Sequence, residues 1–70
     1  MEHKYRIQIL DETSHRIMYF DRMKTSYGGH RIITSLESGK TYASKELAEA
    51  DVLMIHRYYG QSCLVEVVEC

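Results

Sequence analysis

The first half of the chain is patterned by an alternation of apolar and polar side chains. Every second residue of Tyr5–Ile9 is apolar, and this period of two predicts a half-buried strand. The polar segment Asp11–Ser14 predicts a turn, and His15–Phe20 predicts a second strand that pairs with the first as a hairpin. A third strand is predicted over His30–Ser35, which is rich in β-branched residues.

Turn signals flank the third predicted strand. Asp21–Gly29 ends in paired glycines, which predict a turn or a mobile loop. Leu36–Gly39 ends in another glycine and predicts a second turn. The short segment Lys40–Tyr42 that follows is expected to be extended. The third strand is therefore expected to stand between two reversals of the chain.

A helical period replaces the alternation after residue 43. Ser44 is a suitable N-cap, because its hydroxyl can accept a hydrogen bond from an amide of the first turn. Gly60 is placed to end the helix. The residues predicted to form the apolar face of this helix are Leu47, Ala48, Val52, Ile55, Tyr58 and Tyr59. The N-cap, the apolar face and the terminating glycine therefore all indicate a single helix between Ser44 and Gly60.

The last segment, Ser62–Glu69, has one apolar face and one mixed face. This pattern predicts a central strand with the helix packed across it. The predicted order is therefore β-β-β-α-β. This is an α+β fold with an antiparallel or mixed sheet and one helix packed on one face, in a single domain over residues 1–70. Its edge strands carry no proline, so we expect one of them to pair with a second copy in a homodimer.

Composition and charge limit the classes of function. With 44% hydrophobic and 27% charged residues, the chain is typical of folded domains and not of disordered ones. The net charge of −1 divides into +2 over residues 1–35 and −3 over residues 36–70. A dedicated nucleic-acid binder usually carries a strongly basic field. The mildly basic first half nevertheless leaves a small nucleic-acid- or nucleotide-binding domain as an alternative.

Metal and catalytic motifs are not evident in the sequence. The spacing of Cys63 and Cys70 fits no zinc motif and is too long for a disulfide within one strand. We interpret Cys63 as a small core residue and Cys70 as a free thiol. We predict no metal, no cofactor and no enzymatic activity. The chain shows no signal peptide and no run of about 20 apolar residues, so we expect a cytoplasmic protein without a membrane partner.

Tyrosine and arginine around the glycine turn are the best candidates for binding. Six tyrosines in 70 residues is a high number, and tyrosine is enriched at protein interfaces. The candidate binding residues are Tyr27, His30, Arg31, Arg22 and Asp51. Asp51 falls within the apolar face of the predicted helix, where an unpaired carboxylate would be costly. We expect it either to pair with an arginine or lysine at the helix edge or to line a binding groove.

Two stretches, Gly39–Ala50 and Val65–Glu69, resemble small accessory proteins of bacteriophages and prophages. In these proteins an aromatic residue at a strand end leads into Ser-Lys-Glu-x-Ala at a helix start, here Ser44–Ala48. The resemblance implies a protein that binds and occludes a host or defence protein in the host-cell cytoplasm, as an inhibitor or anti-defence factor. Asp51 departs from the pattern, because that position is usually apolar. A structural, self-associating subunit is the remaining alternative.

Overall fold

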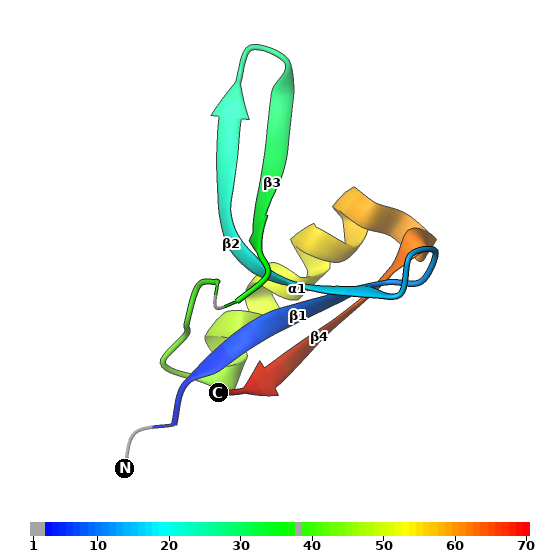
Figure 1. Cartoon of the computed structure of the whole chain (residues 1–70). Helices are drawn as coiled ribbons and strands as arrows, with labels where there is room; N and C mark the ends of the chain where they lie inside the picture. Colours follow the sequence, from blue (N-terminus) through cyan, green and yellow to red (C-terminus); the bar gives the residue numbers. More distant parts are fainter. Residues whose placement is uncertain (1–2, 38) are drawn as a thin grey trace.

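The computed structural model describes residues 3–37 and 39–70. In this part of the chain the elements are β1 (Tyr5–Asp11), β2 (Arg16–Ser26), β3 (Gly29–Ser35), α1 (Lys45–Tyr59), a 3₁₀ turn over Gly60–Ser62, and β4 (Cys63–Glu69). The strands form one antiparallel sheet in the order β3-β2-β1-β4. Figure 1 shows α1 packed against one face of this sheet. The predicted α+β fold of order β-β-β-α-β is thereby confirmed.

The core lies between α1 and the face of the sheet that it covers. Its buried residues are Ile7, Ile9, Phe20, Ile32, Tyr42, Ala48, Ile55 and Cys63. The alternation in β1 therefore has the predicted cause, because every second side chain meets the helix. The other face of the sheet has no covering layer in the described part of the chain (Figure 1).

Both predicted ends of the helix are confirmed. Ser44 Oγ accepts a hydrogen bond from the Leu47 amide at 3.2 Å. At the other end Gly60 has φ 64°, and its N–H donates to the His56 carbonyl. Glycine suits this position because a left-handed φ carries no steric penalty without a Cβ atom.

The buried side of α1 is narrower than the predicted apolar face. Ala48 and Ile55 are buried and Val52 packs against the core, whereas Leu47 and Tyr58 are exposed. Leu47 precedes Ala48 directly and is therefore turned about 100° away from it around the helix axis. The helix packs chiefly against β4 and β1 of the four-stranded sheet, and these strands do not cover both directions. Leu47 and Tyr58 belong to the predicted apolar face but therefore lie outside the buried side of the helix.

The last strand lies at an edge of the sheet, and the prediction of a central strand was wrong. β4 pairs along its whole length with β1, from Tyr5↔Glu69 to Asp11↔Cys63, and with no other strand in the described chain. Its two faces are arranged as predicted, since Cys63 is buried against the core and Leu64 is exposed. One covered face is enough to produce an apolar alternation, so the pattern did not distinguish an edge from a centre.

The connection between β1 and β2 is a turn over residues 12–15, so the strand predicted from His15 begins at Arg16 instead. Asp11 Oδ1 accepts hydrogen bonds from the amides of Thr13 at 2.9 Å and Ser14 at 3.4 Å. These bonds to the carboxylate hold the pKa of Asp11 below its usual range. His15 closes the turn with φ 58°, a left-handed conformation that no strand residue adopts.

Most of the segment predicted as a turn or mobile loop, Asp21–Gly29, is strand. β2 continues to Ser26, and only Tyr27 and Gly28 form the turn before β3. This part of β2 is paired with β3 across the hairpin, and the register runs from Tyr19↔Ser35 to Ser26↔Gly29. Backbone pairing of this kind does not require apolar side chains, so the hydrophobic pattern did not show it.

The segment between β3 and α1 passes the end of β1. The amide of Lys40 donates to the Phe20 carbonyl at 2.8 Å, and Tyr42 exchanges two backbone hydrogen bonds with Tyr5, at 3.0 and 2.7 Å. The predicted extended conformation of Lys40–Tyr42 is confirmed. Tyr42 also donates its hydroxyl hydrogen to Asp51 at 2.6 Å. The partner of Asp51 is therefore a tyrosine and not the expected arginine or lysine.

Both cysteines are free thiols, with Cys63 buried and Cys70 exposed, as predicted. Within residues 3–37 and 39–70, no helix is both long enough and apolar enough to cross a membrane.

Candidate interaction surface

A two-stranded arm projects from the body of the protein. β2 pairs with β1 only from Arg16 to Tyr19, and a register shift between Phe20 and Arg22 then turns it away. At the end of β1 the place of β2 is taken by Tyr42. Beyond the shift, β2 and β3 therefore pair only with each other, and Figure 1 shows them rising clear of β1 and β4. We call residues 22–33 the arm.

The arm has two different faces. Met23 and Ile32 stand opposite each other in the register, and both pack against the core. They hold the base of the arm on the body. The next pair along, Lys24 and Arg31, points to the other face because side chains alternate along a strand. Arg22 lies two residues before Lys24 and shares its face.

The cationic face of the arm is not explained by the stability of the fold. Lys24 and Arg31 are direct cross-strand neighbours, and like charges so placed are destabilising. Among residues 3–37 and 39–70, the ion pairs are His3 with Glu69 and Lys45 with Glu49. The three cations of the arm therefore have no carboxylate partner in the described chain.

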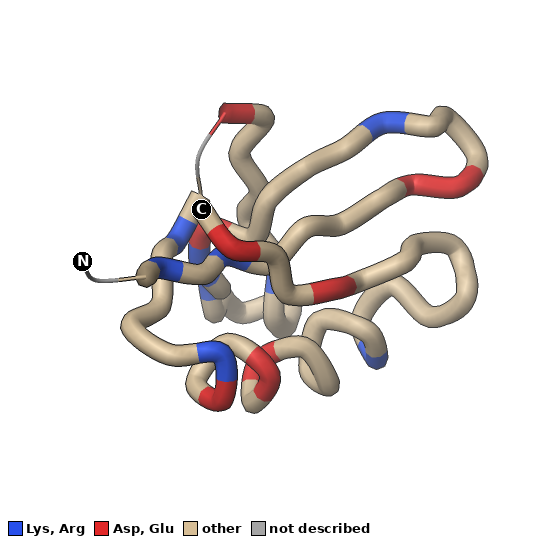
Figure 2. The backbone as a smooth tube through the Cα atoms, turned by 90° about the horizontal axis from the view of Figure 1, so that it is seen from below, with Lys and Arg blue, Asp and Glu red and all other residues tan. Residues whose placement is uncertain are grey.

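Charge is separated between the arm and the rest of the chain. Residues 22–35 carry Arg22, Lys24 and Arg31 and no acidic residue. Since the whole chain has a net charge of −1 and this segment +3, the remainder carries −4. Figure 2 looks at the body from below, with the arm behind it, and shows acidic positions along β4 and α1. The protein thus has a cationic projection on an acidic body.

The tip of the arm presents an aromatic ring. Tyr27 is fully exposed in the turn between β2 and β3. Thr25 Oγ1 and His30 Nδ1 lie 3.2 Å apart just below it. A hollow of about 340 Å³ is lined by residues of the arm, among them Lys24, His30 and Arg31, and by Tyr58 of α1. The arm thus combines exposed aromatic rings with unpaired cations.

Four of the five predicted binding residues lie on this arm. Arg22, Tyr27, His30 and Arg31 are all exposed. Asp51 lies apart from them on α1, bonded to Tyr42. Two residues of the surface were absent from the predicted site, Lys24 and Tyr58. Lys24 would have followed from a hairpin register that pairs it with Arg31, whereas the position of Tyr58 depends on how α1 crosses the sheet.

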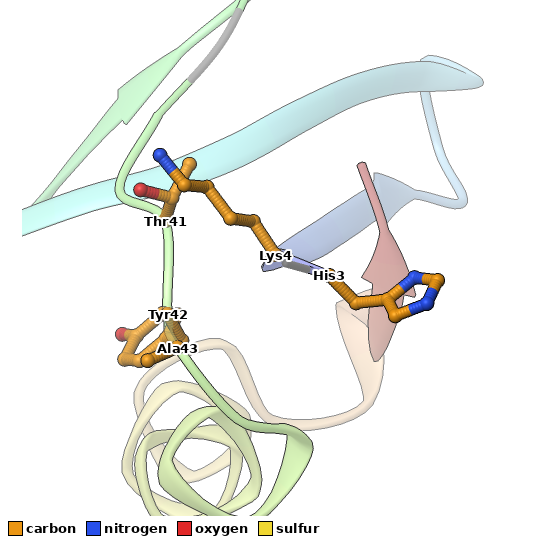
Figure 3. A pocket seen from close by; sticks show the side chains of 5 residues that line it. All are labelled: His3, Lys4, Thr41, Tyr42 and Ala43. Atoms are coloured by element: carbon orange, nitrogen blue, oxygen red, sulfur yellow. The ribbon is translucent and has the colours of Figure 1, made fainter. Parts of the chain in front are cut away.

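A second hollow, of about 460 Å³, opens beside the start of α1. It is lined by His3, Lys4, Thr41, Tyr42 and Ala43 (Figure 3). Its polar groups are largely engaged within the fold, because His3 pairs with Glu69 and the Tyr42 hydroxyl with Asp51. Lys40 Nζ lies 4.8 Å from the centre of the Tyr42 ring. We therefore regard the arm as the better candidate for an interaction surface.

Comparison of the chain with protein-family models, with curated proteins and with solved structures found no match in any of the three.

Proposed function

We propose that this chain is a non-enzymatic binding protein that docks its β2–β3 arm onto an acidic surface of a partner protein and occludes it. The observation that carries the proposal is the unpaired cationic face of the arm beside the exposed Tyr27. Tyrosine and arginine are the residue types that most often dominate binding energy at protein interfaces. The like charges of Lys24 and Arg31 stand opposite each other and so do not stabilise the fold itself.

The separation of charge favours a protein partner over an extended polyanion. An acidic patch on a protein can match the three cations of the arm without meeting the body, whose net charge is −4. The acidic positions of β4 and α1 would repel any part of a long nucleic acid that came close to the body. The host or defence protein as the partner class rests on the resemblance to phage accessory proteins.

A direct test captures partners from host-cell lysate with tagged protein, with and without nuclease, and compares arm variants with a matched control. Arg31→Glu reverses one charge of the cationic face. It also places opposite charges across the strands, so the arm should fold as well as before or better. Arg57→Glu makes the same change of charge at an exposed position of α1, outside the arm.

We expect the wild type and Arg57→Glu to retain one protein after nuclease treatment. Arg31→Glu and Tyr27→Ala should lose it. Retention of the same protein by Arg31→Glu would show that the arm is not the docking element. Loss of all captured protein on nuclease treatment would instead favour nucleic acid.

A nucleic-acid ligand is the second candidate, favoured by the shape of the arm. The major groove of DNA admits a two-stranded β-ribbon, and the arm is such a ribbon with cations on one face. Three phosphate contacts predict a slope of about −2.7 for log K against log salt on duplex DNA. Fluorescence anisotropy over a salt series measures this slope, and Arg31→Glu should make it shallower.

A further inference from the structure

The hollow at the end of the arm is positively charged. It has a volume of about 340 Å³ and is formed by Lys24, Ser26, Gly28, Gly29, His30 and Arg31 of the arm together with Tyr58 of α1. Lys24 and Arg31 give it two positive charges, and no aspartate or glutamate of the described chain lines it. A hollow lined by charge of one sign attracts a ligand of the opposite sign. Its ligand is therefore expected to be an anion.

The pairing of β2 with β3 keeps the polar groups of this hollow at a fixed spacing. Lys24 stands opposite Arg31, and Ser26 stands opposite Gly29 two positions further along the hairpin. Because side chains alternate along a strand, Lys24, Ser26 and Arg31 belong to the same face of the arm. Two cations and a hydroxyl group are thus presented together. An anion bound between the cations would relieve the repulsion of their like charges.

The turn of the arm leaves room for a ligand beside the backbone. A Cβ atom added at Gly28 or at Gly29 would meet nothing within 4 Å, so the space next to both residues is open. Backbone N–H groups in turns form concave sites for anions, and the absence of a side chain lets an anion approach them closely. The hollow therefore combines charged side chains with an accessible stretch of backbone.

We propose that this hollow binds a phosphate monoester group. At neutral pH such a group carries a charge of about −1.5 to −2 and three acceptor oxygens, so it can pair with both cations at once. A carboxylate or a phosphodiester carries a single charge and would leave one cation without a partner. The side chain of Tyr58 also lines the hollow and is 49% exposed, which offers aromatic surface to the organic part of the ligand.

The phosphate monoester has two sources, a phosphorylated side chain of a partner protein and a free phosphorylated compound. The inference names the chemistry that the arm recognises, and it rests on the proposed function only for the first source. Binding of phosphate by the purified chain supports the site even if no protein is captured from lysate. Capture of a protein by a chain that binds no phosphate overturns the inference and leaves the proposed docking of the arm intact.

NMR of the isotope-labelled chain tests the site directly. Inorganic phosphate and phenyl phosphate are added at neutral pH, with the ionic strength held constant by chloride. The amide signals of Gly28 and Gly29 should shift and reach saturation with both ligands, and phenyl phosphate should bind more tightly because of Tyr58. Wild-type protein whose amide shifts grow in proportion to added phosphate without saturating would overturn the proposal.

Lys24→Gln and Lys45→Gln form a matched pair of variants, because each removes one positive charge from an exposed lysine. Lys45 begins α1 and lies about 20 Å along the helix from Tyr58. Lys24→Gln should weaken phosphate binding about fivefold, whereas Lys45→Gln should leave it unchanged. The amide spectrum of each free variant reports whether the fold is kept. Equal weakening by the two substitutions would indicate a general effect of charge and would overturn the proposal.

Phosphatase treatment of the host-cell lysate before capture distinguishes the two sources. A phosphorylated protein partner should be retained from untreated lysate and lost from treated lysate. Capture that withstands phosphatase, together with saturable phosphate binding by the purified chain, would assign the hollow to a free phosphorylated compound. Arg31→Gln should weaken phosphate binding as Lys24→Gln does, and unchanged affinity in both folded variants would overturn the proposal.

Discussion

The hydroxyl of Tyr42 donates a 2.6 Å hydrogen bond to Oδ2 of Asp51 and so joins the segment before α1 to the helix itself. The backbone of Tyr42 is paired with Tyr5 at the same time. One buried tyrosine therefore connects the start of β1 to α1. The bond also explains how a carboxylate is tolerated beside the apolar side of the helix, because a part-buried charge is costly only when it lacks a partner. Asp51 thus has a structural role that requires no ligand.

Removal of the Tyr42 hydroxyl should destabilise the protein without altering its fold. Tyr42→Phe leaves the Asp51 carboxylate without its donor and should lower the free energy of unfolding by about 2 kcal/mol. Asp51→Ala should cost a similar amount, and the double variant should cost at least about 1 kcal/mol less than the sum. Urea denaturation of the four proteins measures this coupling. Strictly additive losses would mean that the bond contributes nothing beyond its two side chains.

Alkaline pH should weaken the fold through Tyr42. Burial, followed by the hydrogen bond to the Asp51 carboxylate, raises the pKa of Tyr42 well above that of a free phenol. The unfolded phenol ionises near pH 10, where the folded one still holds its proton. The contribution is therefore complete below pH 10 and is lost as the pH rises toward the higher folded pKa, by up to about 1.4 kcal/mol per pH unit.

Tyr59 adds to this effect, because burial chiefly, then the nearby Cys63 and Tyr58, raise the pKa of its phenol too. Urea midpoints of the wild type and Tyr42→Phe should therefore converge as the pH rises above 10, with a residual slope from Tyr59. Parallel curves would show that Tyr42 does not hold its proton more tightly in the folded state.

Local sequence signals predicted those elements that are determined by neighbouring residues. The cap at Ser44, the end at Gly60 and the alternation in Tyr5–Ile9 each depend on a few adjacent side chains, and each is present in the structure. The sequence predicted a central position for β4, whereas the strand lies at an edge of the sheet. It depends on which strands pair, and that information is distributed over β1, β2 and the crossover before α1.

The candidate surface was predictable in part for the same reason. Tyr27 and its basic neighbours stand out in the sequence because they surround a glycine turn. That Lys24 and Arg31 face each other on a free arm follows from the register shift at Phe20, which no local pattern indicates. A carboxylate at Asp51 stands out within an apolar helix face, but its partner Tyr42 lies nine residues earlier, outside the helix, and could be recognised only from the structure.

The helix cap offers a prediction with a conservative control. Ser44→Ala removes the acceptor of the Leu47 amide and should lower the free energy of unfolding by about 1 kcal/mol. Ser44→Asp keeps an oxygen in the same place and adds a negative charge at the positive end of the helix, so it should be neutral or slightly stabilising. Thermal denaturation followed at 222 nm compares the three proteins. Equal losses in both variants would show that the hydroxyl matters for packing and not as a cap.

Gly39 is the glycine whose replacement should be least tolerated. Its φ is +75°, and a Cβ atom there would lie 2.6 Å from the Phe20 carbonyl oxygen and 2.8 Å from Tyr19 Cβ. That carbonyl also accepts the Lys40 amide hydrogen, so the crossover cannot move away without breaking a 2.8 Å hydrogen bond. The left-handed conformation and the overlap together should make Gly39→Ala less stable by about 3 kcal/mol.

Gly28→Ala is the matched control for that substitution. A Cβ atom at Gly28 meets nothing within 4 Å, and its φ lies outside the left-handed region. The change should alter the free energy of unfolding by no more than about 0.5 kcal/mol, because it affects only the freedom of an exposed turn. Urea denaturation of the two variants should therefore separate them clearly. If Gly39→Ala unfolded at the same midpoint as Gly28→Ala, the crossover would not be held against β2 as closely as its hydrogen bond to Phe20 requires.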